Sequence, residues 1–471
     1  MSTASELVLG IDVGTTSVKV VARPVDAQSP IGGTSGAGAV REDGSAGGPE
    51  ATARVPVPWT RVPTGAEIDP RALTDAVRRA LGEALAPWDG GPAVQVVAIG
   101  VASFAESVAL LDRAGEPAAP MVAWFDNRGD AEAPGLADVL AGGEFEAVTG
   151  LPVSGLCSAA TVSALGAEAD LDRVARVLSA ADWVAHALGG EPAFDLTLAS
   201  RTGWLDLAGR AWLPEVVAWT GLRPGAVASL VGPTGSRGRV PSRLPELPAA
   251  LAGAEIVVAG MDHLVAAVGA GAGTAGAVWD SCGTAEAFLR STAPLSRDTV
   301  EAAVRQGFTV GWHAEAPNQV VLGALRSGYA FERVLRLLGV SSADDLARFE
   351  SSAGPPPPDA ALPLVDDPYG ASYALRGLTS ATTPGDVWWS LVDRVAADGA
   401  ALVAGMDSLV GAHDRVVTGG GWAASSWFDR AKRARYAVVE HCAGAEPGAE
   451  GAALLALRTV RGRGPAPSLL P

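Results

Sequence analysis

The 471-residue sequence contains only three cysteines, Cys157, Cys282 and Cys442, which lie far apart and form no C-x-x-C pair. It therefore offers neither a disulfide framework nor a zinc site, and the scarcity of thiols fits a reducing cytoplasm. No uninterrupted run of about 18 apolar residues occurs, so no membrane-spanning helix is predicted. The N-terminus lacks a basic segment, and Asp12 interrupts its apolar run, so no signal peptide is predicted. We expect a cytoplasmic protein.

Lysine is almost absent, because Lys19 and Lys432 are the only two and the other basic residues are arginines. With 35 basic against 52 acidic residues, the net charge is −17. This charge disfavours nucleic acid and anionic membranes as partners. It does not exclude ATP, since a phosphate site is a local arrangement of hydrogen-bond donors.

A chain of 471 residues is too long for one core, so two domains of ordinary size are expected. Strand patterns at Val94–Ser103 and Val108–Leu111 alternate with helical patterns at 69–85 and 171–188. This alternation predicts a layered α/β domain with a mixed sheet. The Gly- and Ser-rich stretch 28–53 is predicted to be a flexible insertion.

The stretch Leu7–Ala22, LVLGIDVGTTSVKVVA, predicts two strands joined by a short polar turn. The turn consists of Gly14, Thr15 and Thr16. A glycine lets backbone N–H groups approach an anion, and the hydroxyls add further donors. The turn is therefore a candidate phosphate site, although an ordinary hairpin with a polar tip is the alternative.

Two charged residues flank this turn. Asp12 ends the first strand, and Lys19 lies in the second. A carboxylate at this place suits a Mg²⁺ that accompanies phosphates and is held largely through water. Lys19 adds a positive charge near the same turn.

A second hairpin of the same design occurs in the other half, with a strand at Ala277–Asp280 and a turn at Cys282, Gly283 and Thr284. Before it, the strand Glu255–Gly260 runs into Met261, Asp262 and His263; after it, the strand Arg415–Thr418 leads into Gly419, Gly420 and Gly421. Two hairpins of one design, one in each half, predict two related domains that face each other across a cleft.

Four blocks resemble, in this order, motifs of the FGGY family of carbohydrate kinases, which has the actin-like ATPase fold. They are IDVGTTSVK at 11–19, AGMDHLVAAVGAG at 259–271, DSCGTAEAF at 280–288 and VVTGGGWAASSWF at 416–428. The resemblance covers about Leu7 to Leu457 and implies an α/β protein of two actin-like (ribonuclease H-like) domains facing each other across a cleft. The first, 1–258, carries the sugar-binding side and the first phosphate motif. The second, 259–460, carries the second phosphate motif and the nucleotide side, and 461–471 is an unstructured tail.

The resemblance places the catalytic aspartate at Asp262, as the base for the incoming hydroxyl. A helix N-cap is the alternative interpretation of this residue. The resemblance also assigns ATP and phosphate contacts to Asp12, Gly14, Thr15, Thr16, Lys19, Gly283 and Thr284. The glycines Gly419, Gly420 and Gly421 would let adenine and ribose lie against bare backbone.

The substrate side is indicated by residues that match the family in part. Glu106 lies where glycerol kinases of the family place a substrate-contacting glutamate, but Ala105 replaces the arginine of that motif. Asp126, with Trp124, resembles a Trp-x-Asp pattern on the substrate side. Surface carboxylates are the alternative for Glu106 and Asp126, and His263 either contacts the sugar or packs.

We therefore predict a Mg²⁺- and ATP-dependent kinase that phosphorylates a hydroxyl of a small sugar. The acidic residues Glu106, Asp126 and Asp262 favour a neutral polyhydroxyl substrate, with a ketopentose or related ketose, as in xylulose kinases, ahead of a polyol or aldonate. An actin-like ATPase without sugar kinase activity is the alternative from another class, and Asp262 argues against it. The sequence indicates no nucleic-acid or membrane partner and leaves a homodimer open.

Overall fold

The computed structural model describes residues 5–25, 50–90, 93–244, 246–283, 285–354, 356, 363–370 and 374–462. Residues 28–49 of the predicted insertion at 28–53 lie outside the described residues, as do residues 463–471 of the predicted tail. The chain packs as two compact units. Unit 1 takes residues up to Gly273, Thr292–Val320 and residues from Ala443 onward, and unit 2 takes Thr274–Ser291 and Val321–Cys442. This division differs from the predicted boundary after residue 258, because 259–273 and the last helix pack with unit 1.

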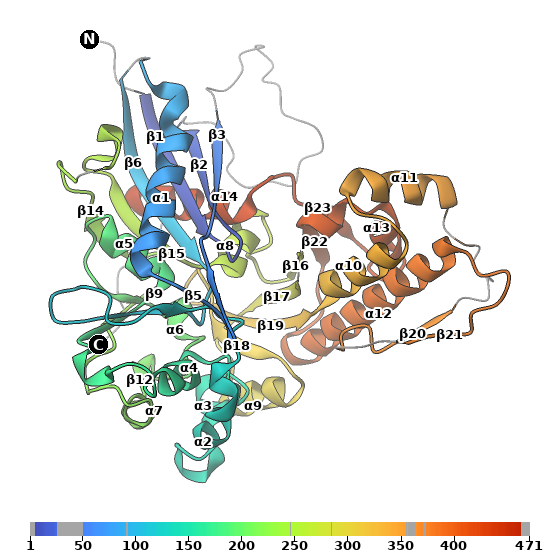
Figure 1. Cartoon of the computed structure of the whole chain (residues 1–471), viewed down its shortest axis with the longest axis horizontal. Helices are drawn as coiled ribbons and strands as arrows, with labels where there is room; N and C mark the ends of the chain where they lie inside the picture. Colours follow the sequence, from blue (N-terminus) through green and yellow to red (C-terminus); the bar gives the residue numbers. More distant parts are fainter. Residues whose placement is uncertain are drawn as a thin grey trace. The chain divides into compact units, whose positions relative to one another are not determined.

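Unit 1 is built on a six-stranded sheet in the order β14-β15-β6-β1-β2-β3. Its strands are β1 (Ser5–Val13), β2 (Ser17–Pro24), β3 (Ala51–Pro56), β6 (Val94–Ser103), β14 (Ser236–Arg239) and β15 (Glu255–Met261). The predicted opening hairpin is confirmed, since β1 and β2 pair antiparallel, while β6 runs parallel to β1 on its other side. Helix α1 (Pro70–Leu85) begins after Asp69, which caps it as predicted, and packs on β2 and β3 (Figure 1).

The C-terminal helix α14 (Pro447–Val460) returns to unit 1 and packs against β1, β6 and α8 (Asp262–Gly269). Close approach requires small residues on both sides. A Cβ added at Gly10 of β1 would lie 1.8 Å from the carbonyl oxygen of Ala449, and one at Gly100 of β6 would lie 1.9 Å from that of Ala452. These contacts explain the Gly- and Ala-rich sequence of α14.

The prediction of one helix over 171–188 is wrong. A short 3₁₀ turn at Leu171–Arg173 is followed by strand β9 (Arg176–Ser179) and helix α5 (Ala180–Ala187). Strand β9 pairs antiparallel with β7 (Val108–Leu111) and buries Val177 and Leu178. The hydroxyl of Ser179 then caps α5, so pairing and capping outweigh the helical pattern.

The other elements of unit 1 are short. Its remaining helices are α2 (Ala133–Ala137), α3 (Phe145–Thr149), α4 (Ser158–Leu165), α6 (Leu196–Ala199), α7 (Pro214–Trp219) and α9 (Arg297–Arg305). Its remaining strands are β4 (Thr60–Val62), β5 (Gly65–Ile68), β8 (Met121–Val122), β10 (Phe194–Asp195), β11 (Leu205–Asp206), β12 (Ala211–Trp212), β13 (Leu230–Val231) and β18 (Thr309–Trp312).

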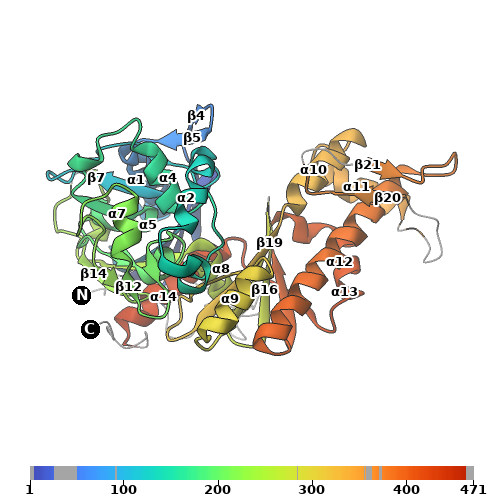
Figure 2. The same cartoon turned by 90° about the horizontal axis from the view of Figure 1, so that it is seen from below.

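In unit 2, the strands β19, β17, β16, β22 and β23 lie in that order in one sheet. They are β16 (Ala277–Cys282), β17 (Glu286–Thr292), β19 (Gln319–Leu325), β22 (Arg415–Gly419) and β23 (Val439–His441). The helices are α10 (Ser327–Leu337), α11 (Ala343–Ala353), α12 (Pro384–Val410) and α13 (Ser426–Arg433), and β20 (Leu364–Asp366) pairs with β21 (Ala374–Arg376) (Figure 2). The predicted second hairpin is confirmed as β16 and β17.

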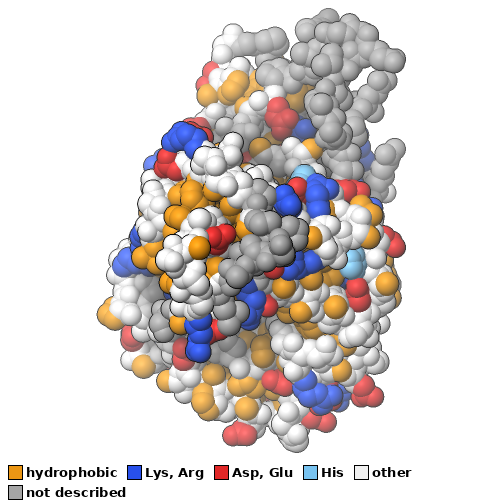
Figure 3. All heavy atoms as spheres, turned by 90° about the vertical axis from the view of Figure 1, so that its right-hand side faces the viewer, with side chains coloured by type: hydrophobic (Ala, Val, Ile, Leu, Met, Phe, Trp, Pro, Cys, Tyr) orange, Lys and Arg blue, Asp and Glu red, His pale blue; other side chains and the backbone are white. Residues whose placement is uncertain are grey.

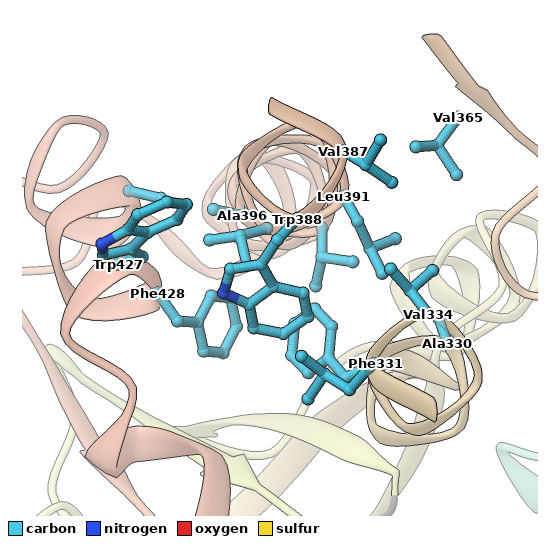
Figure 4. Packing of buried hydrophobic residues seen from close by; sticks show 14 of the residues in the cluster. Ala330, Phe331, Val334, Val365, Val387, Trp388, Leu391, Ala396, Trp427 and Phe428 are labelled. Atoms are coloured by element: carbon cyan, nitrogen blue, oxygen red, sulfur yellow. The ribbon is translucent and has the colours of Figure 1, made fainter. Parts of the chain in front are cut away.

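The core of unit 2 lies among these helices and is aromatic (Figure 4). Phe331 of α10 meets Trp388 of α12, Phe428 of α13 and Trp422 edge-on, with ring centroids 5.1–5.2 Å apart. Such edge-to-face contacts fix the helices relative to one another beyond simple burial.

The outer surface carries both signs of charge. On the face in Figure 3, acidic, basic and apolar side chains are interspersed. Among the described helices, none combines the length and apolar character that crossing a membrane requires.

Candidate active site

Two tryptophans hold the turn at Gly14, Thr15 and Thr16 in unit 1, which is the first predicted phosphate turn. The indole N–H of Trp59 donates to the carbonyl oxygen of Thr15 at 2.6 Å, and that of Trp124 donates to the Thr15 hydroxyl at 2.8 Å. The backbone N–H of Gly14 donates to the carbonyl of Ser17 at 3.1 Å, and Thr16 is exposed at the tip. Trp124, predicted on the substrate side, is thus bonded to the predicted phosphate turn. No local sequence pattern indicated Trp59.

Asp12 and Lys19 lie opposite each other in the register of β1 and β2. The Lys19 ammonium lies 3.1 Å from the Asp12 carboxylate and 3.4 Å from that of Glu446, which also pairs with Arg54. Burial acts to lower the pKa of Lys19, but the two carboxylates outweigh it and the pKa is raised. Glu446 precedes α14 and is distant in sequence from Lys19, so sequence spacing did not reveal it.

The Asp12 carboxylate fits a hydrated divalent cation. It is 6% exposed, and its Oδ1 has no hydrogen-bond partner in the described part of the chain. A Cβ added at Gly448 would lie 2.7 Å from Asp12 Oδ2, so the first turn of α14 approaches this carboxylate. A buried carboxylate oxygen without a partner is a ligand or water acceptor of the kind that Mg²⁺ uses.

Asp262 is the first residue of α8, directly after β15. Met261 is the N-cap residue, and no side chain caps this helix, so the N-cap interpretation of Asp262 does not hold. Its carboxylate is half-buried and accepts the backbone N–H of His263 at 2.7 Å. Burial raises the pKa of Asp262 to about 6; His263 opposes this shift, and the negative charges of Asp12 and Glu106 add to it. A carboxylate with such a pKa is suited to accept a proton near neutral pH.

Glu106 lies in a left-handed backbone conformation, with φ at 64°, between β6 and β7. Both Nε and Nη2 of Arg201 approach its Oε1 at 2.8 Å, and Nη1 of Arg201 donates to the Thr309 hydroxyl at 2.6 Å. A non-glycine residue in this conformation is costly and often marks a functional position. Arg201 offsets the charge of Glu106 and was not singled out from the sequence.

Asp126 belongs to a buried network. It is 1% exposed, and its two oxygens accept five hydrogen bonds of 3.0–3.3 Å: from the Thr64 hydroxyl, the Ala66 N–H, and the N–H, Nε and Nη2 of Arg128. Burial acts to raise the pKa of Asp126, but the hydrogen bonds from Arg128 and Thr64 lower it by more, so the pKa lies below its usual value. These bonds fill the acceptor capacity of a carboxylate, so Asp126 holds its loop in place. It is neither the surface carboxylate nor the free acceptor for a sugar hydroxyl that the sequence left open.

In unit 2, the second hairpin carries a closed charged cluster beneath its turn. Lys432 of α13 contacts Asp280, lies 2.6 Å from Glu286 and 3.3 Å from the Cys282 sulfur, and all four residues are buried. The N–H of Gly283 donates to the carbonyl of Ser281 at 3.0 Å. The predicted phosphate contact Thr284 lies outside the described residues.

The triple glycine follows β22 and packs on the same hairpin. Gly420 has a φ of 97°, and an added Cβ would lie 2.7 Å from the carbonyl oxygen of Cys282. A Cβ at Gly419 would lie 2.4 Å from the Trp279 ring. Gly421 is open and, with Trp422, lines a cavity of about 790 Å³ that α10 and α11 also border.

The predicted residues therefore gather within each unit. In unit 1, a hydrogen bond joins Trp124 to the predicted phosphate turn, an ion pair joins Lys19 to Asp12, and the charges of Asp12 and Glu106 act on Asp262. His263 is half-buried beside Asp262. In unit 2, Gly420 packs against Cys282, the residue before Gly283, and Gly421 lines the cavity. Asp126 stands apart in its own network.

Residues 51–269 match the FGGY family of carbohydrate kinases, N-terminal domain. The chain is 25% identical over 228 residues to a gluconokinase of Bacillus subtilis (strain 168), covering 48% of this chain and 40% of the relative. It is 29% identical over 287 residues to an autoinducer-2 kinase of Yersinia enterocolitica, covering 57% and 48%. The matches thus span less than half the length of these relatives.

The fold is similar to that of a xylulose kinase from Rhodospirillum rubrum, with a TM-score of 0.81 and 23% identity over 96% of this chain and 90% of the other. This likeness confirms the predicted two-domain actin-like fold. Residues 51–269 are thus similar to the N-terminal domain of the FGGY family of carbohydrate kinases, and the chain is similar in fold to a solved xylulose kinase.

Proposed function

We propose that this protein transfers a phosphoryl group from ATP to a hydroxyl of a small sugar. The observation that carries the proposal is Asp262, a half-buried carboxylate at the start of α8 whose pKa is raised to about 6. The family match at 51–269 and the two phosphate-type hairpins support it. An actin-like ATPase without sugar kinase activity is not favoured, because it has no need of a base directed at a sugar hydroxyl.

In this proposal, Asp262 accepts the proton of the attacking hydroxyl as the O–P bond forms and ADP leaves. The turn at Gly14, Thr15 and Thr16 donates hydrogen bonds to phosphate oxygens, and Trp59 and Trp124 hold Thr15 in place. Asp12 would hold Mg²⁺ through water, and the bound ion would offset phosphate charge. Lys19 orients Asp12 through its ion pair.

The nucleotide side of the proposal rests on unit 2. The turn at Gly283 contacts phosphates, and the cavity beside Gly421 and Trp422 takes adenine and ribose. Its volume of about 790 Å³ lies within the usual range for small-molecule sites. Gly419 and Gly420 act indirectly, since both pack against β16 rather than line this cavity.

For the substrate, we propose a ketose such as a ketopentose. Two observations support this choice: the similarity in fold to a xylulose kinase and the position of Glu106. An aldonate is the second candidate, and the structure strengthens it. Arg201 neutralises Glu106 and Asp126 is fully bonded, so the substrate side is less acidic than the sequence indicated. A guanidinium beside the site can donate hydrogen bonds to the carboxylate of such a substrate.

A screen that follows ADP release across ketoses, polyols and aldonates tests the proposal. Asp262→Asn should keep ATP binding and lower turnover by about 10²–10⁴-fold, the usual cost of losing a general base. Turnover within a few-fold of the parent would remove Asp262 from this role. ADP release that no sugar stimulates would contradict the kinase proposal itself.

A further inference from the structure

A buried segment of unit 1, residues 195–200, packs against the end of β15, directly before Asp262. Asp195 caps α6, and its Oδ1 accepts the Thr197 N–H at 2.8 Å and the Thr197 hydroxyl at 2.5 Å. Both side chains are at most 1% exposed. The Thr197 hydroxyl is therefore fixed as a donor to Asp195 and keeps its lone pairs for another partner.

That partner is the backbone directly before Asp262. The N–H of Met261 donates to the Thr197 hydroxyl at 3.0 Å. A Cβ added at Gly260, whose φ is 119°, would lie 2.5 Å from the same oxygen. The register of β15 against β6 shifts between Val258 and Gly260, so the strand bulges where it meets Thr197. One hydroxyl thus ties the end of β15, and the first residue of α8 after it, to α6.

Asp195 is itself anchored. Its N–H donates to Asp182 Oδ2 at 3.0 Å, and Asp182 pairs with Arg237 at 3.1 Å and accepts the Ser179 hydroxyl at 2.6 Å. Asp182 and Arg237 are buried, so this pair is rigid and costly to break. The path from Arg237 to Met261 consists of direct hydrogen bonds only.

We propose that Thr197 is a positioning residue that sets the place of the Asp262 carboxylate in the proposed kinase reaction. It contacts neither substrate nor reacting atoms and acts through the Met261 N–H and the bulge at Gly260. The inference rests on the proposed role of Asp262 as the base. Displacing a reacting group by about 1 Å can cost about 10²-fold in rate, so one hydrogen bond at this place matters.

Thr197→Val removes the hydroxyl at nearly constant volume and should lower kcat roughly 10- to 100-fold while leaving KM for sugar and ATP within about twofold. Thr197→Ser should restore kcat to within about threefold of the parent, because it keeps the hydroxyl. Thr202→Val is the matched control. Thr202 is as buried as Thr197 and lies in the turn after α6. Its substitution by valine removes only the hydrogen bonds of its hydroxyl with Ala199 and Trp204. A loss of kcat in Thr197→Val no larger than in Thr202→Val, or no rescue by serine, would overturn the proposal.

Hydrogen exchange tests the proposal without any activity. The amides at 260–264 should exchange faster in Thr197→Val than in Thr202→Val, measured at equal global stability. Equal exchange in the two variants would overturn the positioning role, even if the kinase proposal holds. If Thr197→Val exchanges faster but keeps the parent kcat, or if Asp262→Asn stays active, then Thr197 holds the backbone before Asp262 but Asp262 is not the base. Failure of the positioning role and failure of the proposed function can therefore be distinguished. If Thr197→Val does not fold, Thr197→Ala carries the same test.

Discussion

The two hairpins share one plan and differ in what the carboxylate of the first strand meets. In unit 1, Asp12 pairs with Lys19 from the return strand, whose side chain is 23% exposed. In unit 2, Asp280 pairs with Lys432 from α13, whose side chain is 3% exposed. The only two lysines of the chain thus occupy equivalent chemical positions. An ammonium beside the strand-end carboxylate is common to both hairpins, whereas its burial is not.

This difference in burial indicates different roles for the ion pairs Asp12–Lys19 and Asp280–Lys432. Lys432 is enclosed by Asp280 and Glu286 and lies 4.2 Å from the centroid of the Phe428 ring. This buried cluster joins α13 to β16 and β17, and within it only Glu286 Oε2 among the carboxylate oxygens lacks a hydrogen-bond partner in the described part of the chain. Asp12 differs from Asp280 in its partners: both Asp280 oxygens have one, from Lys432 and the Cys282 thiol, whereas Asp12 Oδ1 has none in the described part of the chain. The pair in unit 1 therefore suits the proposed Mg²⁺ site, whereas the pair in unit 2 holds the hairpin against α13.

The largest effect should follow from removing the buried lysine. Lys432→Met leaves two buried carboxyl groups without their cation and should lower the free energy of unfolding by about 3–5 kcal/mol. Urea unfolding measures the loss. Lys19→Met is the matched control and should cost clearly less, because Lys19 is partly exposed. The variant Lys432→Met with Asp280→Asn and Glu286→Gln should recover part of the stability. Equal losses at the two lysines would contradict the division of roles.

A smaller effect separates the two aspartates in function. Asp12→Asn should raise the Mg²⁺ concentration for half-maximal ADP release by about 10- to 100-fold, which is the usual cost of losing a residue that supports a metal ion indirectly, here through water. Asp280→Asn should leave that concentration unchanged and lower stability instead. Initial rates across a Mg²⁺ series, with each variant's unfolding curve, measure both quantities. A shift in Mg²⁺ dependence for Asp280→Asn would mean that the closed cluster opens toward the ligand.

The hairpins were predictable because their signals are local. Valine-rich strands, a strand-end aspartate and a Gly-containing turn lie within a few residues of one another, and β1–β2 and β16–β17 form accordingly. The same holds for Asp262 at the junction of a strand and a helix. The error at 171–188 has the opposite cause. The pairing of β9 with the distant β7 decides that segment, and no local pattern contains it.

The partners of the candidate site could not be predicted for a related reason. Glu446 lies far along the chain from Lys19, Arg201 from Glu106, and Lys432 from Asp280. Only folding brings each pair together. The scarcity of lysine was visible in the sequence, but it did not identify the carboxylates that the two lysines meet.

A third effect concerns pH and distinguishes the titrating groups of the two units. Burial raises the pKa of Glu286 from 4.5 to about 8. Between these two pH values, the folded state therefore keeps a proton on Glu286 that the unfolded state has lost. Stability from this group is therefore greatest at low pH and falls as pH rises through that range. Glu286→Gln should flatten the decline, measured by urea unfolding between about pH 5 and pH 8.

The rate should respond differently. Because the pKa of Asp262 is raised to about 6, kcat should fall below that pH as the base becomes protonated. Glu286→Gln should leave this acidic limb in place. A variant that moved both profiles together would show that stability, and not the base, sets the pH dependence of the rate.

The smallest effect tests the turns themselves, with the same substitution in each. Neither Gly14 nor Gly283 has a positive φ, and an added Cβ would lie 3.2 Å from the Ser17 carbonyl oxygen and 3.3 Å from that of Ala285. Alanine should therefore fit either turn with little strain, and it gains up to about 0.4–1 kcal/mol from a less flexible unfolded chain. Its methyl group nevertheless occupies the space that the proposal gives to phosphate. Gly14→Ala and Gly283→Ala should each weaken ATP binding a few-fold by calorimetry, with stability unchanged or slightly raised. Weakening in only one variant would assign the phosphates to that hairpin alone, and unchanged affinity in both would remove the turns from the nucleotide site.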